Sequence, residues 1–127
     1  MKMISSRTHT MIGLIVGAAL LLAPWLFGFS DNAIAATTAW VIGALVIVNE
    51  LITTSPLSLL KVVPMRAHLF VDYLTGAILA LSPWLFGFAD APANAWVPHL
   101  LVGILIIGYA VMTNPASEST GHHAAAM

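Results

Sequence analysis

The chain repeats one hexapeptide: Pro24-Trp25-Leu26-Phe27-Gly28-Phe29 recurs as Pro83-Trp84-Leu85-Phe86-Gly87-Phe88, 59 residues further on. The same spacing relates other pairs of identical residues: Lys2 and Lys61, Arg7 and Arg66, His9 and His68, Gly17 and Gly76, Asp31 and Asp90, and Pro56 and Pro115. Self-similarity at a fixed spacing is the signature of a duplicated structural unit. The spacing therefore predicts one unit over residues 1–56, a second over residues 57–115, and a separate polar and alanine-rich tail over residues 116–127.

The composition places these units in a membrane. Of the 127 residues, 60% are apolar and 7% are charged, and the mean hydropathy is +0.97. A soluble domain carries about 25% charged residues, and a disordered chain needs low hydrophobicity, so both classes are excluded. Four basic against five acidic residues leave no positive surface for nucleic acid. The absence of cysteine excludes disulfides and thiolate sites.

Each unit contains two apolar stretches long enough to cross a bilayer, which takes about 20 residues in a helix. The stretches are residues 10–29 and 33–52 in the first unit, and 67–88 and 95–112 in the second. Their continuous apolar character favours helices over the alternating strands of a membrane barrel. We therefore predict an all-α membrane protein of four transmembrane helices, arranged as two helical hairpins. Because each unit has an even number of spans, both hairpins should enter the membrane in the same direction, related by a pseudo-twofold axis along its normal.

The basic residues predict the orientation. Lys2 and Arg7 precede the first span, and Lys61 and Arg66 lie between the second and the third. With four spans these two segments are on the same side of the membrane. The positive-inside rule then places both termini in the cytoplasm, and a bacterial inner membrane is the expected location.

Each copy of the hexapeptide is predicted to end a helix at the lipid headgroups. Its proline lacks an N–H and is expected to kink or end the helix, while its tryptophan suits the aromatic belt of a membrane protein. Its glycine permits a tight reversal of the chain. The structural positions are Pro24, Trp25 and Gly28 in the first copy, and Pro83, Trp84 and Gly87 in the second.

The second copy resembles the SPW-repeat family of small integral membrane proteins. Ser82-Pro83-Trp84 carries the signature of that family, whereas the first copy reads Ala23-Pro24-Trp25 and departs at the serine. A serine hydroxyl beside a proline kink can bond the carbonyl of the preceding turn. The resemblance covers both units and implies two-helix membrane repeats, but it supplies no catalytic residues.

Polar residues gather at the predicted cytoplasmic ends of the spans. Ionisable groups inside a membrane are costly and often functional. The simplest interpretation is electrostatic: the basic groups extend toward the headgroups, and Glu50 and Asp72 pair with them. The alternatives are a proton-linked site at His68 and Asp72, and a pair of axial haem ligands or a metal pair at His9 and His68. We predict no metal site. The inner polar layer comprises Arg7, His9, Glu50, Arg66, His68 and Asp72.

Small residues mark the predicted helix contacts at Gly13, Gly17, Gly76 and Gly103. Such residues let helices approach closely in lipid. The simplest interpretation is packing within the chain, and the alternative is docking onto a larger membrane complex.

No catalytic motif is present in the sequence. We therefore expect a non-enzymatic accessory or scaffold subunit, in contact with lipids and with other membrane subunits or a second copy. One alternative is a small transporter or channel that uses the polar layer around Asp72. The other is a haem or quinone protein using His9 and His68. No cofactor is predicted, although a lipid or quinone tail could occupy an outward pocket, whose expected lining is Trp25, Phe29, Trp84 and Phe88.

Overall fold

The computed structural model describes residues 3–53, 60 and 62–114. This part of the chain forms four helices: α1 (Ser6–Leu26), α2 (Ala33–Ile52), α3 (Met65–Leu85) and α4 (Ala93–Met112). All four are long and apolar enough to span a membrane. Apart from two isolated β-bridges, the described residues contain no extended pairing. The protein is therefore an all-α membrane protein, and the predicted class is confirmed. The predicted tail over residues 116–127 lies outside the described residues, as do Lys2, Pro56, Lys61 and Pro115 of the repeat.

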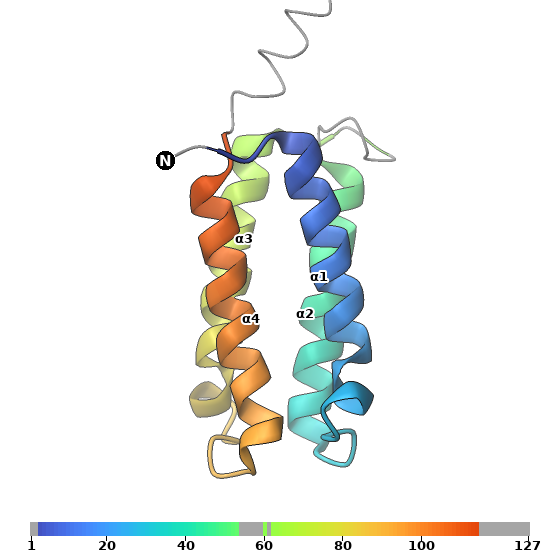
Figure 1. Ribbon diagram of the computed structural model, residues 1–127, viewed down its shortest axis with the longest axis vertical. Coiled ribbons are helices and arrows are strands. Elements are labelled where there is room, and N and C mark those ends of the chain that lie inside the picture. The colour runs from blue at the N-terminus through green and yellow to red at the C-terminus, as the bar shows by residue number, and fades with distance from the viewer. Residues whose placement is uncertain (1–2, 54–59, 61, 115–127) are drawn as a thin grey trace, which may run out of the picture.

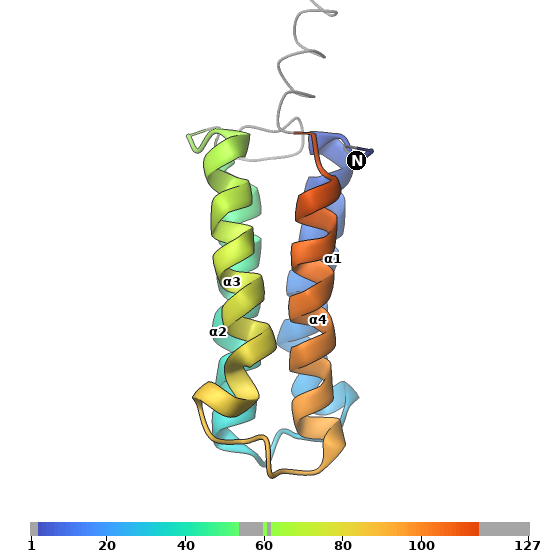
Figure 2. The same cartoon turned by 90° about the vertical axis from the view of Figure 1, so that its left-hand side faces the viewer.

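The helices form two antiparallel hairpins that stand side by side (Figure 1). One hairpin is α1 and α2 and the other is α3 and α4, and both begin at the same end of the bundle. We call this the terminal end, and the opposite one, which holds both hairpin turns, the turn end. Across the hairpins, α2 lies beside α3 and α1 beside α4 (Figure 2).

The bounds of the two hairpins correspond closely. The limits of α3 are those of α1 shifted by 59 residues, and the limits of α4 are those of α2 shifted by 60. The second turn is therefore one residue longer. The two β-bridges, Ile4 with Thr113 and Val63 with Thr53, follow the same shifts. The pseudo-twofold axis stays a prediction, which these shared bounds support.

Three predicted spans differ from the observed helices at their ends. The first was predicted over residues 10–29 and is Ser6–Leu26, the third over 67–88 and is Met65–Leu85, and the fourth over 95–112 and is Ala93–Met112. Only the bounds of α2 coincide with the prediction. Hydropathy misses the polar first turns, such as that of α1, where the Ser5 side chain accepts a hydrogen bond from the backbone N–H of Thr8.

Each hexapeptide ends its helix through glycine. Gly28 and Gly87 have φ of 76° and 79°, a left-handed conformation that glycine adopts without strain. The next residue then donates its N–H back to the proline carbonyl, from Phe29 to Pro24 and from Phe88 to Pro83, each over 2.8 Å. This is the hydrogen bond of a Schellman helix end. The proline lies inside the last turn of its helix, and glycine reverses the chain.

Glycines hold each hairpin tightly together. A Cβ on Gly17 would lie 3.0 Å from the carbonyl oxygen of Gly43, and a Cβ on Gly76 would lie 3.0 Å from that of Gly103. Because lipid provides no hydrophobic drive between helices, such backbone approach is a principal source of hairpin stability. These glycines pack within the chain.

Apolar side chains fill the middle of the bundle. The buried core cluster comprises Val16, Leu20, Ile42, Val46, Leu79, Ile106 and Tyr109. Large apolar side chains also cover the outer surface, as lipid contact requires. The core separates a polar cluster at the terminal end from the turn end.

Candidate functional site

Four polar side chains meet inside the bundle near the terminal end. They are His9 on α1, Glu50 on α2, and His68 and Asp72 on α3, and none is more than 1% exposed. His9 Nε2 lies 2.8 Å from His68 Nε2 and 2.8 Å from Asp72 Oδ2. His68 Nε2 lies 3.0 Å from Glu50 Oε1 and 3.0 Å from Asp72 Oδ2. We call these residues the polar cluster.

The two hairpins contribute equally to the polar cluster. His9 and Glu50 come from the first hairpin, and His68 and Asp72 come from the second. On α3 His68 and Asp72 are four residues apart, so they share one helix face. The residue of α1 that corresponds to Asp72 is Gly13, and a Cβ at that position would overlap the Glu50 carboxylate. In the first hairpin the carboxylate is therefore that of Glu50 on α2. It occupies the space beside Gly13 on α1, where a side chain would not fit.

Two threonines at helix ends orient the histidine rings. His9 Nδ1 lies 2.7 Å from Thr113 Oγ1, just beyond α4. His68 Nδ1 lies 2.6 Å from Thr53 Oγ1, just beyond α2. Each contact crosses from one hairpin to the other. All four helices therefore help to position the polar cluster.

Backbone hydrogen bonds at the terminal end also connect the two hairpins. The N–H of Ile4 donates to the carbonyl of Met112, and the N–H of Asn114 donates to the carbonyl of Ile4, each over 2.9 Å. In the corresponding place, Val63 donates to the carbonyl of Ile52 over 2.9 Å. The segment before the first helix of each hairpin is thus bonded to the end of the other hairpin's second helix.

The structure places the predicted polar layer in two groups. Glu50, His68 and Asp72 join His9 in the polar cluster, whereas Arg7 and Arg66 are exposed at its periphery. Among the described residues, no ion pair links either arginine to these carboxylates, which instead contact the histidines. The carboxylates therefore pair with the histidines of the predicted layer rather than with its arginines. The sequence gives the depth of a side chain but not the rotation of its helix, so it could not distinguish these partners.

Sequence reasoning missed Thr53, Thr113 and Tyr109. The Tyr109 ring lies 5.0 Å from that of His9, and its hydroxyl is buried without a hydrogen-bond partner among the described residues. One signal was available, since Thr53 and Thr113 are 60 residues apart and end equivalent helices.

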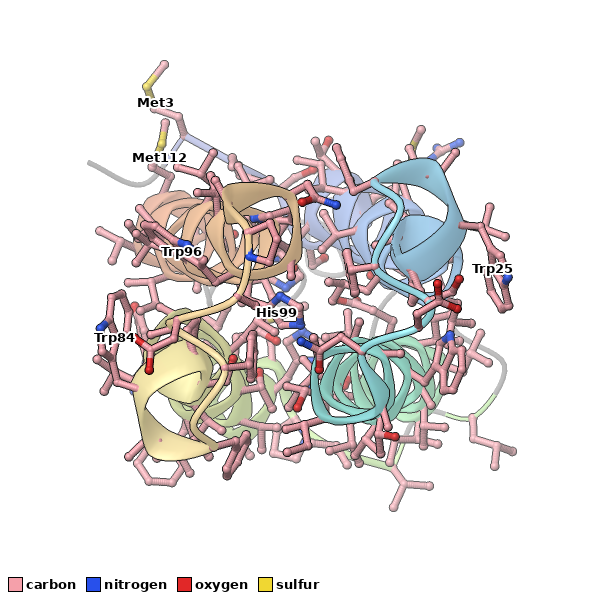
Figure 3. All side chains as sticks on the ribbon, turned by 90° about the horizontal axis from the view of Figure 1, so that it is seen from below. Met3, Trp25, Trp84, Trp96, His99 and Met112 are labelled. Atoms are coloured by element: carbon pink, nitrogen blue, oxygen red, sulfur yellow. The ribbon has the colours of Figure 1, made fainter. Side chains whose placement is uncertain are left out.

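A third buried histidine lies at the turn end. His99 places Nδ1 2.8 Å from the carbonyl oxygen of Ala95 and Nε2 2.9 Å from that of Ala35 on α2. Its ring lies between those of Phe29 and Phe88, with centroids 5.3 and 4.7 Å away. Figure 3 shows His99 in the centre of the bundle. This contact joins the hairpins at the end opposite the polar cluster.

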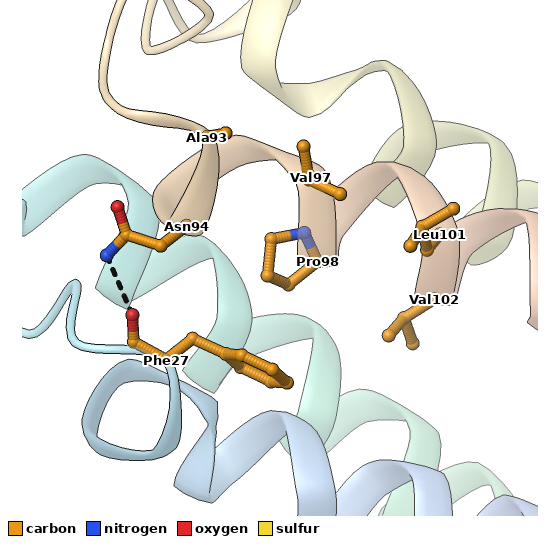
Figure 4. Close-up of a pocket in the computed structure, with 7 residues that line it drawn as sticks. All are labelled: Phe27, Ala93, Asn94, Val97, Pro98, Leu101 and Val102. Atoms are coloured by element: carbon orange, nitrogen blue, oxygen red, sulfur yellow. Dashed lines mark hydrogen bonds between the residues drawn. The ribbon is translucent and has the colours of Figure 1, made fainter.

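The expected pocket between the two hexapeptides does not form. Trp25 and Trp84 point outward from the bundle (Figure 3), whereas Phe29 and Phe88 point inward against His99. The described chain instead has an apolar groove of about 420 Å³ beside α4 (Figure 4). At its edge Asn94 donates a hydrogen bond of 2.7 Å to the carbonyl of Phe27. The groove is lined by Phe27, Ala93, Asn94, Val97, Pro98, Leu101 and Val102.

These features define a small membrane protein built from a duplicated helical hairpin. The family model for the SPW repeat domain matches residues 6–113, from the first residue of α1 to the residue after α4. The chain therefore belongs to the SPW repeat family, as the resemblance at Ser82-Pro83-Trp84 indicated. The hydroxyl of Ser82 donates 2.6 Å to the carbonyl of Leu79 in the preceding turn. Neither the curated proteins nor the solved structures contain a match.

Replacing Gly13 with alanine tests the packing of the polar cluster. The added Cβ must displace Glu50 from its contacts with both histidines. We expect Gly13→Ala to lower the free energy of unfolding by about 1–3 kcal/mol, measured in detergent micelles. The matched control is Gly108→Ala, where a Cβ meets nothing within 4 Å. Equal stabilities of the two variants would contradict the observed arrangement.

Proposed function

We propose that this chain is a non-catalytic accessory or scaffold subunit, which docks against another transmembrane helix through the outer face of α4. The observation that carries the proposal is Gly108, which is exposed on that face with nothing within 4 Å of its Cβ position. A glycine on a lipid-facing surface forms a notch into which a neighbouring helix can pack closely.

The exposed residues of α4 make a continuous face around this notch. Leu101, Leu105, Gly108 and Met112 are spaced three or four residues apart and are all exposed, so they lie along one side of the helix. The apolar groove begins on the same side at Leu101. In the most apolar 18-residue stretch of α4, 33% of the residues are buried, against 44–50% in the corresponding stretches of the other helices. Of the four helices, α4 therefore offers the largest share of its surface to a partner.

The corresponding face of α2 lacks the notch. Val48 stands at the position equivalent to Gly108 and is 52% exposed. A β-branched side chain keeps a neighbouring helix further away than glycine does. The difference between two otherwise similar hairpins supports α4 as the docking helix.

The other candidate functions receive less support. A transporter needs a polar path, whereas the core cluster between the polar cluster and the turn end is apolar. A haem bound by His9 and His68 would place iron and a porphyrin between the two Nε2 atoms. These atoms lie 2.8 Å apart, which leaves no space for the ring. The sequence also carries no catalytic motif.

The location we propose is a bacterial inner membrane with both termini in the cytoplasm. Arg7 and Arg66 are exposed at the terminal end, where α1 and α3 both begin (Figure 1). Basic residues at one end of a bundle favour the cytoplasmic side. The turn end, which carries Asp31 and Asp90, would then face outward.

Single-cysteine labelling tests this orientation, because the chain has no cysteine of its own. Thr8→Cys and Ala67→Cys occupy equivalent exposed positions at the terminal end, and Ser30→Cys is exposed at the turn end. In intact spheroplasts a membrane-impermeant maleimide should label only Ser30→Cys, and lysis should expose the other two. Labelling of Thr8→Cys and Ala67→Cys from opposite sides would overturn the orientation and the parallel hairpins together.

Filling the notch on α4 tests the docking. Gly108→Leu should release the chain from its native assembly, because the larger side chain prevents close helix approach. Val48→Leu is the matched control on α2 and should leave the assembly intact. The measurement is the mass of the complex extracted from native membranes in mild detergent. A wild-type chain that migrates alone, or an assembly unaffected by Gly108→Leu, would contradict the proposal.

A further inference from the structure

We infer that the polar cluster is a binding site for one divalent first-row transition-metal ion, with Zn²⁺ as the ion that fits best. The ligands are Nε2 of His9, Nε2 of His68, and one carboxylate oxygen each from Glu50 and Asp72. This inference goes beyond the docking of α4, and it stands on the interior of the bundle alone.

The four ligand atoms already converge. They all lie within 4.8 Å of one another, and all four residues are buried. In tetrahedral zinc sites the bonds to nitrogen and oxygen are about 2.0–2.2 Å, which places neighbouring ligand atoms about 3.3 Å apart. The contacts of the two Nε2 atoms here are 2.8–3.3 Å long. To reach this spacing the two Nε2 atoms, now 2.8 Å apart, would move apart by about half an ångström. Ligand atoms that are up to 4.8 Å apart would close around the ion.

The threonines fix the tautomer that a metal requires. The hydroxyl of Thr113 donates its proton to the carbonyl of Tyr109 over 2.6 Å, and that of Thr53 donates to the carbonyl of Asn49. Each hydroxyl oxygen is then an acceptor for the histidine beside it, so the proton of the neutral ring lies on Nδ1. Each Nε2 consequently turns its lone pair toward the centre of the cluster. Outer hydrogen bonds of this kind orient metal-binding histidines in general.

Such a centre requires positive charge. The Nε2 lone pairs of the two histidines and the two carboxylates face one another in the buried interior, where like charges repel strongly. Only one proton can lie between the two Nε2 atoms across 2.8 Å, so protonating both rings there brings two N–H groups into collision. A divalent ion accepts all four electron pairs at once. It also balances the two carboxylates, which leaves a neutral site inside the membrane.

The donor set selects the class of ion. Two imidazole nitrogens and two carboxylate oxygens suit zinc and its first-row neighbours. Calcium takes six to eight oxygens and magnesium takes an octahedron of oxygens, and the cluster supplies neither. Four protein ligands also close the coordination sphere, as in structural rather than catalytic zinc sites. The ion would join His9 and Glu50 of one hairpin to His68 and Asp72 of the other.

The test measures metal retained by the full chain. The purified protein is loaded with Zn²⁺ or Co²⁺ in detergent, desalted, and analysed for metal per chain. We expect one equivalent in the wild type, with the intense visible bands of tetrahedral Co²⁺. Asp72→Asn keeps the side-chain shape, removes a charged ligand, and should lose the ion. A variant with His122→Ala and His123→Ala removes the tail histidines and should retain it.

A matched pair of threonine variants tests the tautomer argument. Thr53→Val removes the acceptor beside His68 and should weaken metal binding about 10–100-fold. Thr38→Val is the control within α2, the helix that Thr53 follows. The Thr38 hydroxyl makes the same type of bond, 2.8 Å to the carbonyl of Ile34, away from the polar cluster. The affinity of this variant should match that of the wild type.

Three results would overturn the inference. The first is a wild-type chain that keeps no ion after desalting, a result that does not depend on whether any variant folds. The second is binding that disappears with the tail histidines and persists in Asp72→Asn. The third is a six-coordinate Co²⁺ spectrum, which indicates an exposed adventitious ion. Because Gly108 is remote from these ligands in the sequence and on the outer face of α4, failure here leaves the docking proposal standing.

Discussion

The contact between the two histidine rings, with a carboxylate from each hairpin beside them, is the interaction on which the assembly of this bundle depends. Within each hairpin, glycines bring the backbones together, and such packing needs no polar group. Between the hairpins, polar contacts at both ends of the bundle are added to the apolar core. The polar cluster and the threonine crossings hold the terminal end, and His99 and Asn94 reach across at the turn end. Inside a bilayer, polar groups must find their hydrogen-bond partners within the protein. They therefore favour one particular arrangement of two apolar hairpins.

The duplicated units have diverged at the polar cluster, where the two hairpins meet. The histidines are equivalent, and so are the threonines that orient them. The carboxylates are not, because α3 supplies Asp72 where α1 has Gly13, and α2 supplies Glu50 where α4 has Ala110. Each hairpin still provides one acid, but from a different helix. The longer Glu50 side chain reaches the centre through the space above Gly13. Two copies of one unit thus complete a single site that neither copy contains alone.

The same divergence appears on the outside. Gly108 opens a notch on α4 where α2 carries Val48. An exact internal repeat would present two identical faces to the membrane, whereas this chain presents one flat face and one notched face. The interior and the surface therefore serve separate purposes in our account. The polar cluster joins the hairpins, and in our proposal α4 would be the helix through which the bundle docks onto a partner.

The membrane class, the four helices and the hairpin pairing follow from the sequence, because they depend on local hydropathy and on a repeated hexapeptide. The role of Gly28 and Gly87 is likewise local, since a positive φ is needed wherever the chain reverses at once. The polar cluster could be predicted only in part. The depths of His9, Glu50, His68 and Asp72 follow from the hydropathy, but their meeting depends on how each helix is rotated. Thr53 and Thr113 lie just beyond the helices, where hydropathy has no information.

The contacts between the hairpins at the turn end are also difficult to predict from the sequence. Asn94 donates a hydrogen bond to the carbonyl of Phe27 in the other hairpin, while Asn32 caps α2 by accepting from the N–H of Ala35. The two residues have different partners because Asn32 is the N-cap of α2, whereas Pro92 is the N-cap of α4 and Asn94 lies inside its first turn. Long-range contacts of this kind require the packed hairpins.

A double-mutant cycle between His9 and Asp72 tests the central claim most directly, since these residues lie on different hairpins, 2.8 Å apart. The free energies of unfolding would be measured for the wild type, His9→Ala, Asp72→Asn and the double variant in the same detergent. If the polar cluster joins the hairpins, the two substitutions should be coupled by about 0.5–3 kcal/mol. Additivity within about 0.3–0.5 kcal/mol would show that the side chains act independently and would contradict the account.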